Sequence, residues 1–168
     1  SQHTYLYGIT VCYTPLTAAV GHIIFVIFAL PIKELTRYHA MRIEHIAIWA
    51  EDIELLRTFY MQYFNMLCGE KYSNPSRNFT SYFLHFREGG ARIELMHKPD
   101  MDTPANRGDL KGLAHFSISV GSREAVDALT GRLKEDGYTV LSGPRTTGDG
   151  YYESSVADPE GNLVEITE

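Results

Sequence analysis

Two histidines and two glutamates recur at matching intervals along the sequence. His45 and Glu94 are 49 residues apart, and His115 and Glu165 are 50 residues apart. The two histidines are separated by 70 residues and the two glutamates by 71. Imidazole nitrogens and carboxylate oxygens bind divalent metals such as Zn, Ni, Co, Fe(II) and Mn. The spacing therefore predicts one metal ion held by His45, Glu94, His115 and Glu165, with positions left open for water or substrate.

Each of the four residues lies in a segment with the composition of a β-strand. Successive side chains of a strand point to opposite faces of the sheet. Seven of the eight residues that flank the four candidates are apolar, and Glu44 is the exception. One face should therefore pack against helices, and the other should carry the imidazoles and carboxylates. An unpaired buried carboxylate costs several kcal/mol, so inward-facing glutamates need a cation or protons.

The elements that would position these residues occur twice. The first half has predicted strands at 42–49, 80–86 and 91–96, with a helix that starts after Asp52 as its N-cap. The second half has predicted strands at 113–120, 138–141, 151–157 and 163–167, with a helix that starts after Ser122. The predicted fold class is α+β: two β-α-β-β-β modules, 41–98 and 112–168, joined by a linker at 99–111. They should form one curved mixed sheet cupped around the metal site.

Residues 1–40 differ from the rest of the chain. Residues 16–30 are almost wholly apolar, but they are shorter than the roughly 20 residues needed to cross a bilayer. No Lys or Arg precedes Lys33, which is unlike the positive start of a secretory signal. We expect an accessory extension, helical in part and packed against protein, and no membrane anchor.

Composition narrows the functional classes further. The net charge is −6 and no basic stripe is present, which argues against a nucleic-acid partner. Cys12 and Cys68 offer neither a CxxC metal spacing nor a disulfide framework, as expected for a cytoplasmic protein. A small molecule is the expected partner.

From about residue 41 to residue 168 the chain resembles the vicinal oxygen chelate superfamily. This superfamily includes glyoxalase I, thiol transferases, extradiol dioxygenases and metal-free bleomycin-resistance proteins. The resemblance rests on four segments: His45-Ile-Ala-Ile, Ile93-Glu94-Leu, Gly112-Leu-Ala-His115 and Asp158-Pro-Glu-Gly-Asn-Leu-Val-Glu165. It implies paired modules, a site often completed across a dimer interface, and hence a homodimer.

The His/Glu/His/Glu set is similar to that of glyoxalase I, a lyase that isomerises the hemithioacetal of methylglyoxal and glutathione. The resemblance implies one Ni, Zn, Co or Mn ion per site, with Fe(II) less favoured. It also implies proton transfer through a metal-stabilised enediolate, with Glu165 as the first candidate base and Glu94 as the second. The alternatives are a thiol transferase or dioxygenase of the same superfamily, and a non-catalytic protein that binds a drug or metabolite.

The expected contacts with glutathione are only partly present. Trp49 stands where glutathione-using glyoxalases have an arginine, and Lys98 stands where they have an asparagine. A basic residue four positions before the third ligand is retained as Lys111, and Arg145 is a possible anion contact in a glycine-containing loop. Trp49 cannot form a bidentate carboxylate contact but can stack on an apolar or aromatic substrate. The predicted substrate is therefore a small oxygenated molecule, and the alternatives are a thiol adduct and a compound without glutathione.

Overall fold

The computed structural model describes residues 3–6, 9–12, 41–99, 101–102 and 111–168. The chain divides into two units, Ser1–Met41 and Arg42–Glu168. In the first unit, strand β1 (His3–Leu6) pairs antiparallel with β2 (Ile9–Cys12). The apolar segment 16–30, and the helix expected there, lie outside the described residues. No helix among the residues that the structure describes is long and apolar enough to span a membrane.

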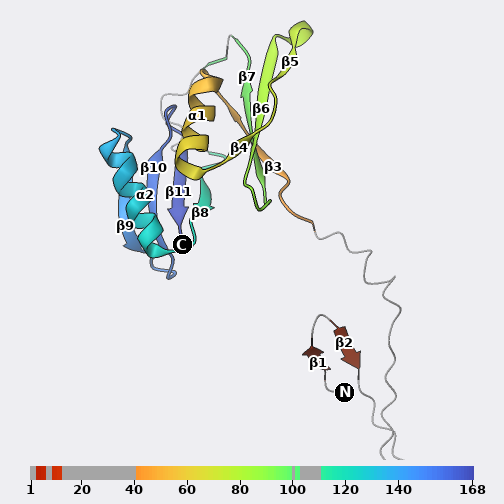
Figure 1. Ribbon diagram of the computed structural model, residues 1–168, viewed down its shortest axis with the longest axis vertical. Coiled ribbons are helices and arrows are strands. Elements are labelled where there is room, and N and C mark those ends of the chain that lie inside the picture. Colours follow the sequence, from red (N-terminus) through yellow and green to blue (C-terminus); the bar gives the residue numbers. More distant parts are fainter. Residues whose placement is uncertain (1–2, 7–8, 13–40, 100, 103–110) are drawn as a thin grey trace, which may run out of the picture. The chain divides into compact units, whose positions relative to one another are not determined.

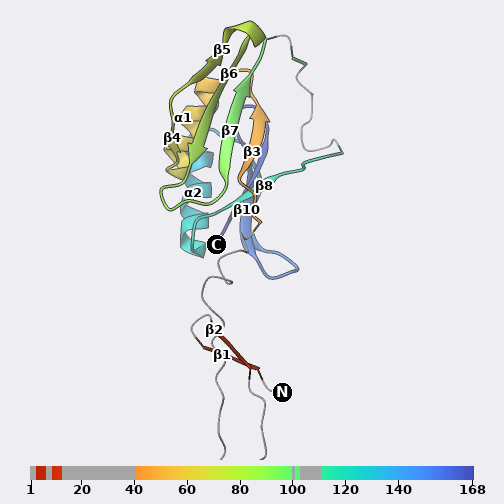
Figure 2. The ribbon, with the colours of Figure 1, turned by 90° about the vertical axis from the view of Figure 1, so that its right-hand side faces the viewer.

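The first module of the larger unit is a five-stranded mixed sheet with one helix (Figures 1 and 2). Its elements are β3 (His45–Trp49), α1 (Ile53–Phe64), β4 (Leu67–Cys68), β5 (Tyr72–Asn74), a short 3-10 helix (Pro75–Arg77), β6 (Phe79–His85) and β7 (Arg92–His97). The strand order is β3-β7-β6-β4, and β5 also pairs with β6. Strands β3 and β7 run parallel, so the first and last strands of the module are neighbours.

The second module repeats this arrangement with a four-stranded sheet. It consists of β8 (Phe116–Ser119), α2 (Arg123–Glu135), β9 (Val140–Thr146), β10 (Tyr152–Ala157) and β11 (Leu163–Thr167). The strand order is β8-β11-β10-β9, and β8 and β11 are parallel. The predicted repeat of two modules is thus confirmed. The predicted single curved sheet is wrong for the described residues, because each module has its own sheet.

The local signals at the helix starts are confirmed. Asp52 Oδ1 accepts hydrogen bonds from the backbone N–H groups of Glu54 and Leu55, each at 3.0 Å. Ser122 Oγ accepts one from the backbone N–H of Ala125 at 3.2 Å. These side chains satisfy donors that have no partner inside a helix, so each helix begins where its capping residue lies.

Strand boundaries were predicted less well. The strand expected at 138–141 runs instead from Val140 to Thr146, through Gly143 and Pro144. Pro144 is tolerated because β9 is the edge strand of its sheet, where a missing N–H costs little. The strand expected at 113–120 is shorter and begins at Phe116, and the short strands β4 and β5 were not predicted.

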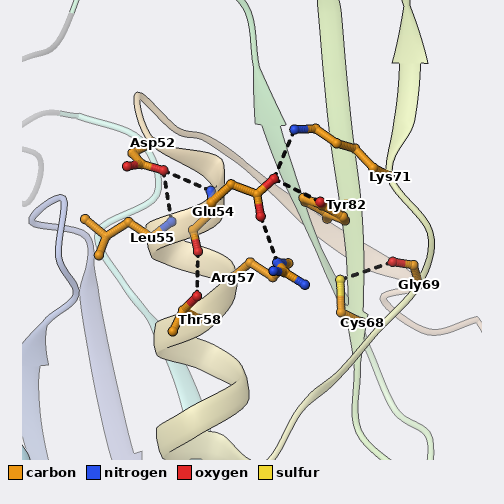
Figure 3. Close-up of polar contacts among 9 residues, drawn as sticks. All are labelled: Asp52, Glu54, Leu55, Arg57, Thr58, Cys68, Gly69, Lys71 and Tyr82. Atoms are coloured by element: carbon orange, nitrogen blue, oxygen red, sulfur yellow. Dashed lines mark hydrogen bonds and ion pairs between the residues drawn. The ribbon is translucent and has the colours of Figure 1, made fainter.

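A polar network on the first turn of α1 fastens the helix to its sheet (Figure 3). The Glu54 carboxylate accepts hydrogen bonds from Lys71 Nζ and Arg57 Nε at 3.0 Å and from Tyr82 OH at 2.9 Å. The hydrogen bond from Lys71 is the main reason that the pKa of Glu54 lies below its ordinary value. The network links α1, the segment before β5 and strand β6, and so fixes the side of the sheet that the helix covers.

Helix α1 also packs on the second module, and in Figure 1 it lies between the two sheets. Phe59 contacts the ring of Tyr138 with a centroid distance of 4.9 Å, and Tyr60 lies 6.2 Å from the ring of Phe116. Tyr60 OH donates to Asp158 Oδ2 at 2.7 Å, and both residues are buried. The aromatic face of α1 therefore belongs to a hydrophobic core that both modules share. These contacts set the position of one module relative to the other.

Candidate metal centre and adjoining pocket

The alternation of faces predicted around the two glutamates is confirmed. Ile93 and Leu95, which flank Glu94, are 4% and 0% exposed, and Val164 and Ile166, which flank Glu165, are fully buried. The glutamates are on the opposite faces of their sheets and are partly exposed, with 17% and 22% of their side chains accessible. Helix packing therefore holds each strand and leaves its carboxylate available on the open face.

The first histidine–glutamate pair lies on the parallel strands β3 and β7. His45 Nε2 is 3.9 Å from Glu94 Oε2. His45 Nδ1 lies 2.5 Å from Glu44 Oε2, and the other oxygen of Glu44 pairs with Arg92 Nη2. An ionised carboxylate can only accept, so Nδ1 is the donor in this contact, and Nε2 is the ring nitrogen near Glu94. The contact with His45, followed by that with Arg92, holds the pKa of Glu44 below its ordinary value against a desolvation effect that raises it.

An outer carboxylate that fixes the tautomer and orientation of an imidazole is a common feature of metal-binding histidines. Glu44 was not proposed as a site residue from the sequence. The available signal was that it is the only non-apolar residue among the eight neighbours of the candidate ligands. It precedes β3, so the alternation of that strand does not keep its side chain away from the imidazole.

The second pair lies at the equivalent strands of the second module. His115, immediately before β8, places Nε2 at 3.1 Å from Glu165 Oε2 on β11. The side chains are 44% and 22% exposed. Two ligands of one Zn-sized ion, each at about 2.0–2.2 Å, are separated by a similar distance. The donor types and spacing of this pair therefore fit a metal.

The structure brings the four predicted ligands together as two pairs. Within the described segments of the larger unit, no group of three or more His, Cys, Asp or Glu side chains converges as a metal site would require. Metal sites in proteins generally use three or four protein ligands, so each pair alone is half of a site.

A pocket of about 560 Å³ lies where the ends of β3 and β7 meet the beginning of β8, and His115 is the one candidate ligand in its lining. Its volume is within the range of small-molecule sites. Three predicted site residues line it, namely Trp49, Lys98 and His115. The other lining residues are Ala47, Ile48, Ala50, Glu51, His97, Pro99, Met101, Asp102, Leu113, Ala114, Phe116, Asn162 and Leu163.

His97 contributes a fixed imidazole to this pocket. Its Nδ1 lies 2.9 Å from the backbone oxygen of Ala50 and must donate to it, because a carbonyl oxygen only accepts. His97 is the last residue of β7, the strand that carries Glu94. Glu51, Asp102 and Asn162 were not predicted, since they come from three separate loops that only the tertiary fold brings to one pocket.

The two remaining predicted substrate residues do not line the pocket. Arg145, on β9, donates to Ser142 Oγ at 2.7 Å and pairs with Glu153 at 3.4 Å. Lys111 is exposed just before the second module. Any contact of either residue with a substrate stays a prediction.

Comparison with known proteins agrees with this arrangement. The sequence profile of the glyoxalase/bleomycin resistance protein/dioxygenase superfamily matches residues 42–166. The chain belongs to this superfamily, which contains metal-dependent enzymes as well as binding proteins. The comparison with curated proteins gave no match.

Several solved structures share the fold. A possible glyoxalase from Bacillus cereus is 27% identical, with a TM-score of 0.57, over 77% of this chain and 100% of that chain. Glyoxalase I from Zea mays is 23% identical, with a TM-score of 0.63, over 75% of this chain and 44% of that chain. The trypanothione-dependent glyoxalase I of Leishmania major is 19% identical, with a TM-score of 0.61, over 77% of this chain and 87% of that chain. This chain thus spans less than half the length of the maize protein.

Proposed function

We propose that the protein is a divalent-metal-dependent lyase or isomerase of the glyoxalase I type. The observation that carries the proposal is the pair of matched imidazole–carboxylate contacts on equivalent strands of the two modules, at 3.9 and 3.1 Å. Two neutral imidazoles and two carboxylates suit Ni, Zn, Co or Mn. When bound, the ion would stabilise negative charge that develops on adjacent oxygens of the substrate.

The ligands of one ion would come from two copies of the chain. His45 and Glu94 of one copy and His115 and Glu165 of the other would complete the donor set that each pair lacks. The support is that both pairs are accessible on open sheet faces but belong to different sheets of the same chain. In a two-fold dimer the same contact occurs twice and gives two equivalent sites.

In this proposal the residues of the chain move the proton. Glu165 would take a proton from the carbon next to a carbonyl and return it to the neighbouring carbon, and Glu94 is the second candidate for this role. Each carboxylate is held by a strand whose flanking side chains are buried, which limits its motion. Such positioning favours proton transfer between adjacent carbons.

The first experiment measures metal binding and proton exchange on the full chain. Titration calorimetry with Ni, Co, Zn or Mn should give one ion per chain, and the loaded protein should exchange deuterium into an α-hydroxycarbonyl thiol adduct. Glu165→Gln should weaken metal binding and abolish exchange, whereas Glu88→Gln, in an exposed turn, should change neither. Full exchange activity in Glu165→Gln would remove the assignment of this base. No exchange with any such adduct or with an acyl thioester would refute the reaction class.

A mixing experiment tests whether the site is shared. His45→Ala and His115→Ala proteins should each be inactive, and a mixture should regain activity, because one of the two sites in the mixed dimer keeps all four ligands. A mixture as inactive as its components, although mixed dimers form, would contradict the shared site.

The pocket supports a second candidate, a non-catalytic binding protein. Most of its lining residues are apolar, which suits retention of a small ligand without chemistry. Tight ligand binding that persists after metal removal, without proton exchange in the loaded protein, would favour this function.

A further inference from the structure

The pocket that contains His115 has a lining of mixed charge and polarity. Among its described lining residues, Glu51 and Asp102 carry carboxylates and Lys98 carries the ammonium group. Ten of the others are apolar, and they include the rings of Trp49 and Phe116. In the metal-free chain, an anionic group among these residues would lose hydration and face two carboxylates against one ammonium group. An uncharged apolar group would lose little hydration there.

Trp49 is the largest side chain of this lining, and it is 40% exposed. It lies two residues after Ala47 on the open face of β3, and Ala47 is directly opposite Glu94 in the parallel register. The indole is therefore two residue pairs along the register from Glu94 and four from His45. The small side chain of Ala47 lies between the imidazole of His45 and the indole, so it leaves space for a substrate on this face.

A second ring packs perpendicular to the indole. Phe79 on β6 meets Trp49 at a centroid distance of 6.2 Å and an interplanar angle of 85°. Phe79 in turn lies 6.2 Å from the ring of Tyr72 on β5. Edge-to-face contacts of this kind are favourable and restrict the orientation of the ring. A fixed and partly exposed indole is suited to stacking on a planar group.

We propose that this pocket selects substrates whose non-reacting part is aromatic or apolar and uncharged, with Trp49 as the stacking surface, and that it disfavours polyanionic thiol peptides such as glutathione. This inference rests on the proposed function, because only an enzyme would have the bound molecule as its substrate. The selectivity of the pocket can nevertheless be measured without metal.

The first test uses the metal-free full chain. Trp49 is the only tryptophan, so its indole N–H gives a single resonance in a ¹H–¹⁵N spectrum. Benzyl alcohol at millimolar concentration should shift this resonance in a saturable manner, and glutathione at the same concentration should not. A shift with glutathione and none with benzyl alcohol, or none with either, would overturn the proposal whether or not metal binds.

The second test uses metal-loaded protein and two hydroxamates that chelate through the same pair of oxygens. Benzohydroxamate should bind about tenfold more tightly than acetohydroxamate, because only the former has a ring to stack. Trp49→Leu should abolish this ratio and Trp49→Phe should retain part of it. Tyr151→Leu, which changes an exposed aromatic residue of the second module outside the pocket lining, should leave it unchanged.

The outcomes separate the two proposals. Equal affinity for both hydroxamates, or a ratio that survives Trp49→Leu, would overturn the selectivity of the pocket while leaving the metal site intact. Failure of the protein to bind metal would refute the proposed function, and the metal-free test would then decide the pocket alone.

Discussion

The hydrogen bond between Tyr60 and Asp158 offers a direct test of how the two modules are joined. Tyr60 is fully buried on α1, and its hydroxyl donates to Asp158 Oδ2 at 2.7 Å. Asp158 is 4% exposed and begins the turn that leads into β11, the strand of Glu165. Tyr60→Phe removes this hydroxyl and keeps the ring, so the change is confined to one bond across the module boundary.

The expected loss of stability in Tyr60→Phe depends on the hydrogen bonds that Asp158 still accepts in this variant. Its carboxylate still accepts from the backbone N–H groups of Glu160 and Asn162, at 3.0 and 2.9 Å, and from Asn162 Nδ2 at 2.8 Å. The buried carboxylate of Asp158 therefore keeps three hydrogen-bond donors in the variant. A hydrogen bond to a charged group contributes roughly 1.5–3 kcal/mol, so we expect a loss of about 2 kcal/mol in the free energy of unfolding. In a chain of this size the corresponding decrease in Tm is roughly 4–8 °C.

Urea unfolding of the full chain, followed by far-UV circular dichroism, measures this loss. Tyr152→Phe is the matched control, because Tyr152 OH also donates to an aspartate, Asp127, at 2.8 Å, but at the surface. Surface polar contacts exchange readily with water, so the control should lose much less stability. A Tyr60→Phe loss no greater than that of the control would refute the view that this bond holds α1 to the second module.

Three further predictions concern stability and the metal site. Asp52→Ala removes the cap that accepts two backbone N–H groups and should destabilise the chain by about 1 kcal/mol in urea unfolding, with Ser122→Ala for comparison. Burial and carboxylate contacts raise the pKa of Tyr63 and Tyr82 above the ordinary 10.0 in the folded state. Their contribution to stability should thus be complete below about pH 10 and be lost as the pH rises further, which unfolding at pH 8 to 11 would show; an unchanged midpoint would contradict it. Glu44→Ala should lower metal affinity about 10- to 100-fold without unfolding the chain, because His45 loses the partner that fixes its tautomer, and calorimetry that finds unchanged affinity would exclude that role.

Sequence reasoning succeeded where the determining interactions are local. The N-caps Asp52 and Ser122 were recognised because a capping side chain acts within three residues of its position. Strand β11 was predicted at its observed bounds because the turn before it has proline and glycine at their preferred positions. The alternation around Glu94 and Glu165 was likewise correct, since apolar neighbours on a strand report the buried face.

The sequence failed where pairing partners decide the outcome. Strands β4 and β5 contain two and three residues, too few for a periodic pattern, and they are strands because β6 lies beside them. Strand β9 continues through Gly143 and Pro144 because an edge strand needs hydrogen bonds on one side only. No local signal distinguishes such a strand from a loop.

For the candidate metal centre, too, some features follow from the sequence and others only from the tertiary structure. The sequence by itself determined the four residue types, their repeated spacing and the face that Glu94 and Glu165 occupy, because each depends on position along one strand. Tertiary structure decided that His45 meets Glu94 and His115 meets Glu165 in separate sheets, and that Trp49, His97 and Lys98 share a pocket with His115. The reason is physical: α1 packs on both modules through Phe59 and Tyr60, and the packing of buried aromatic rings depends on shape across elements that sequence spacing cannot encode.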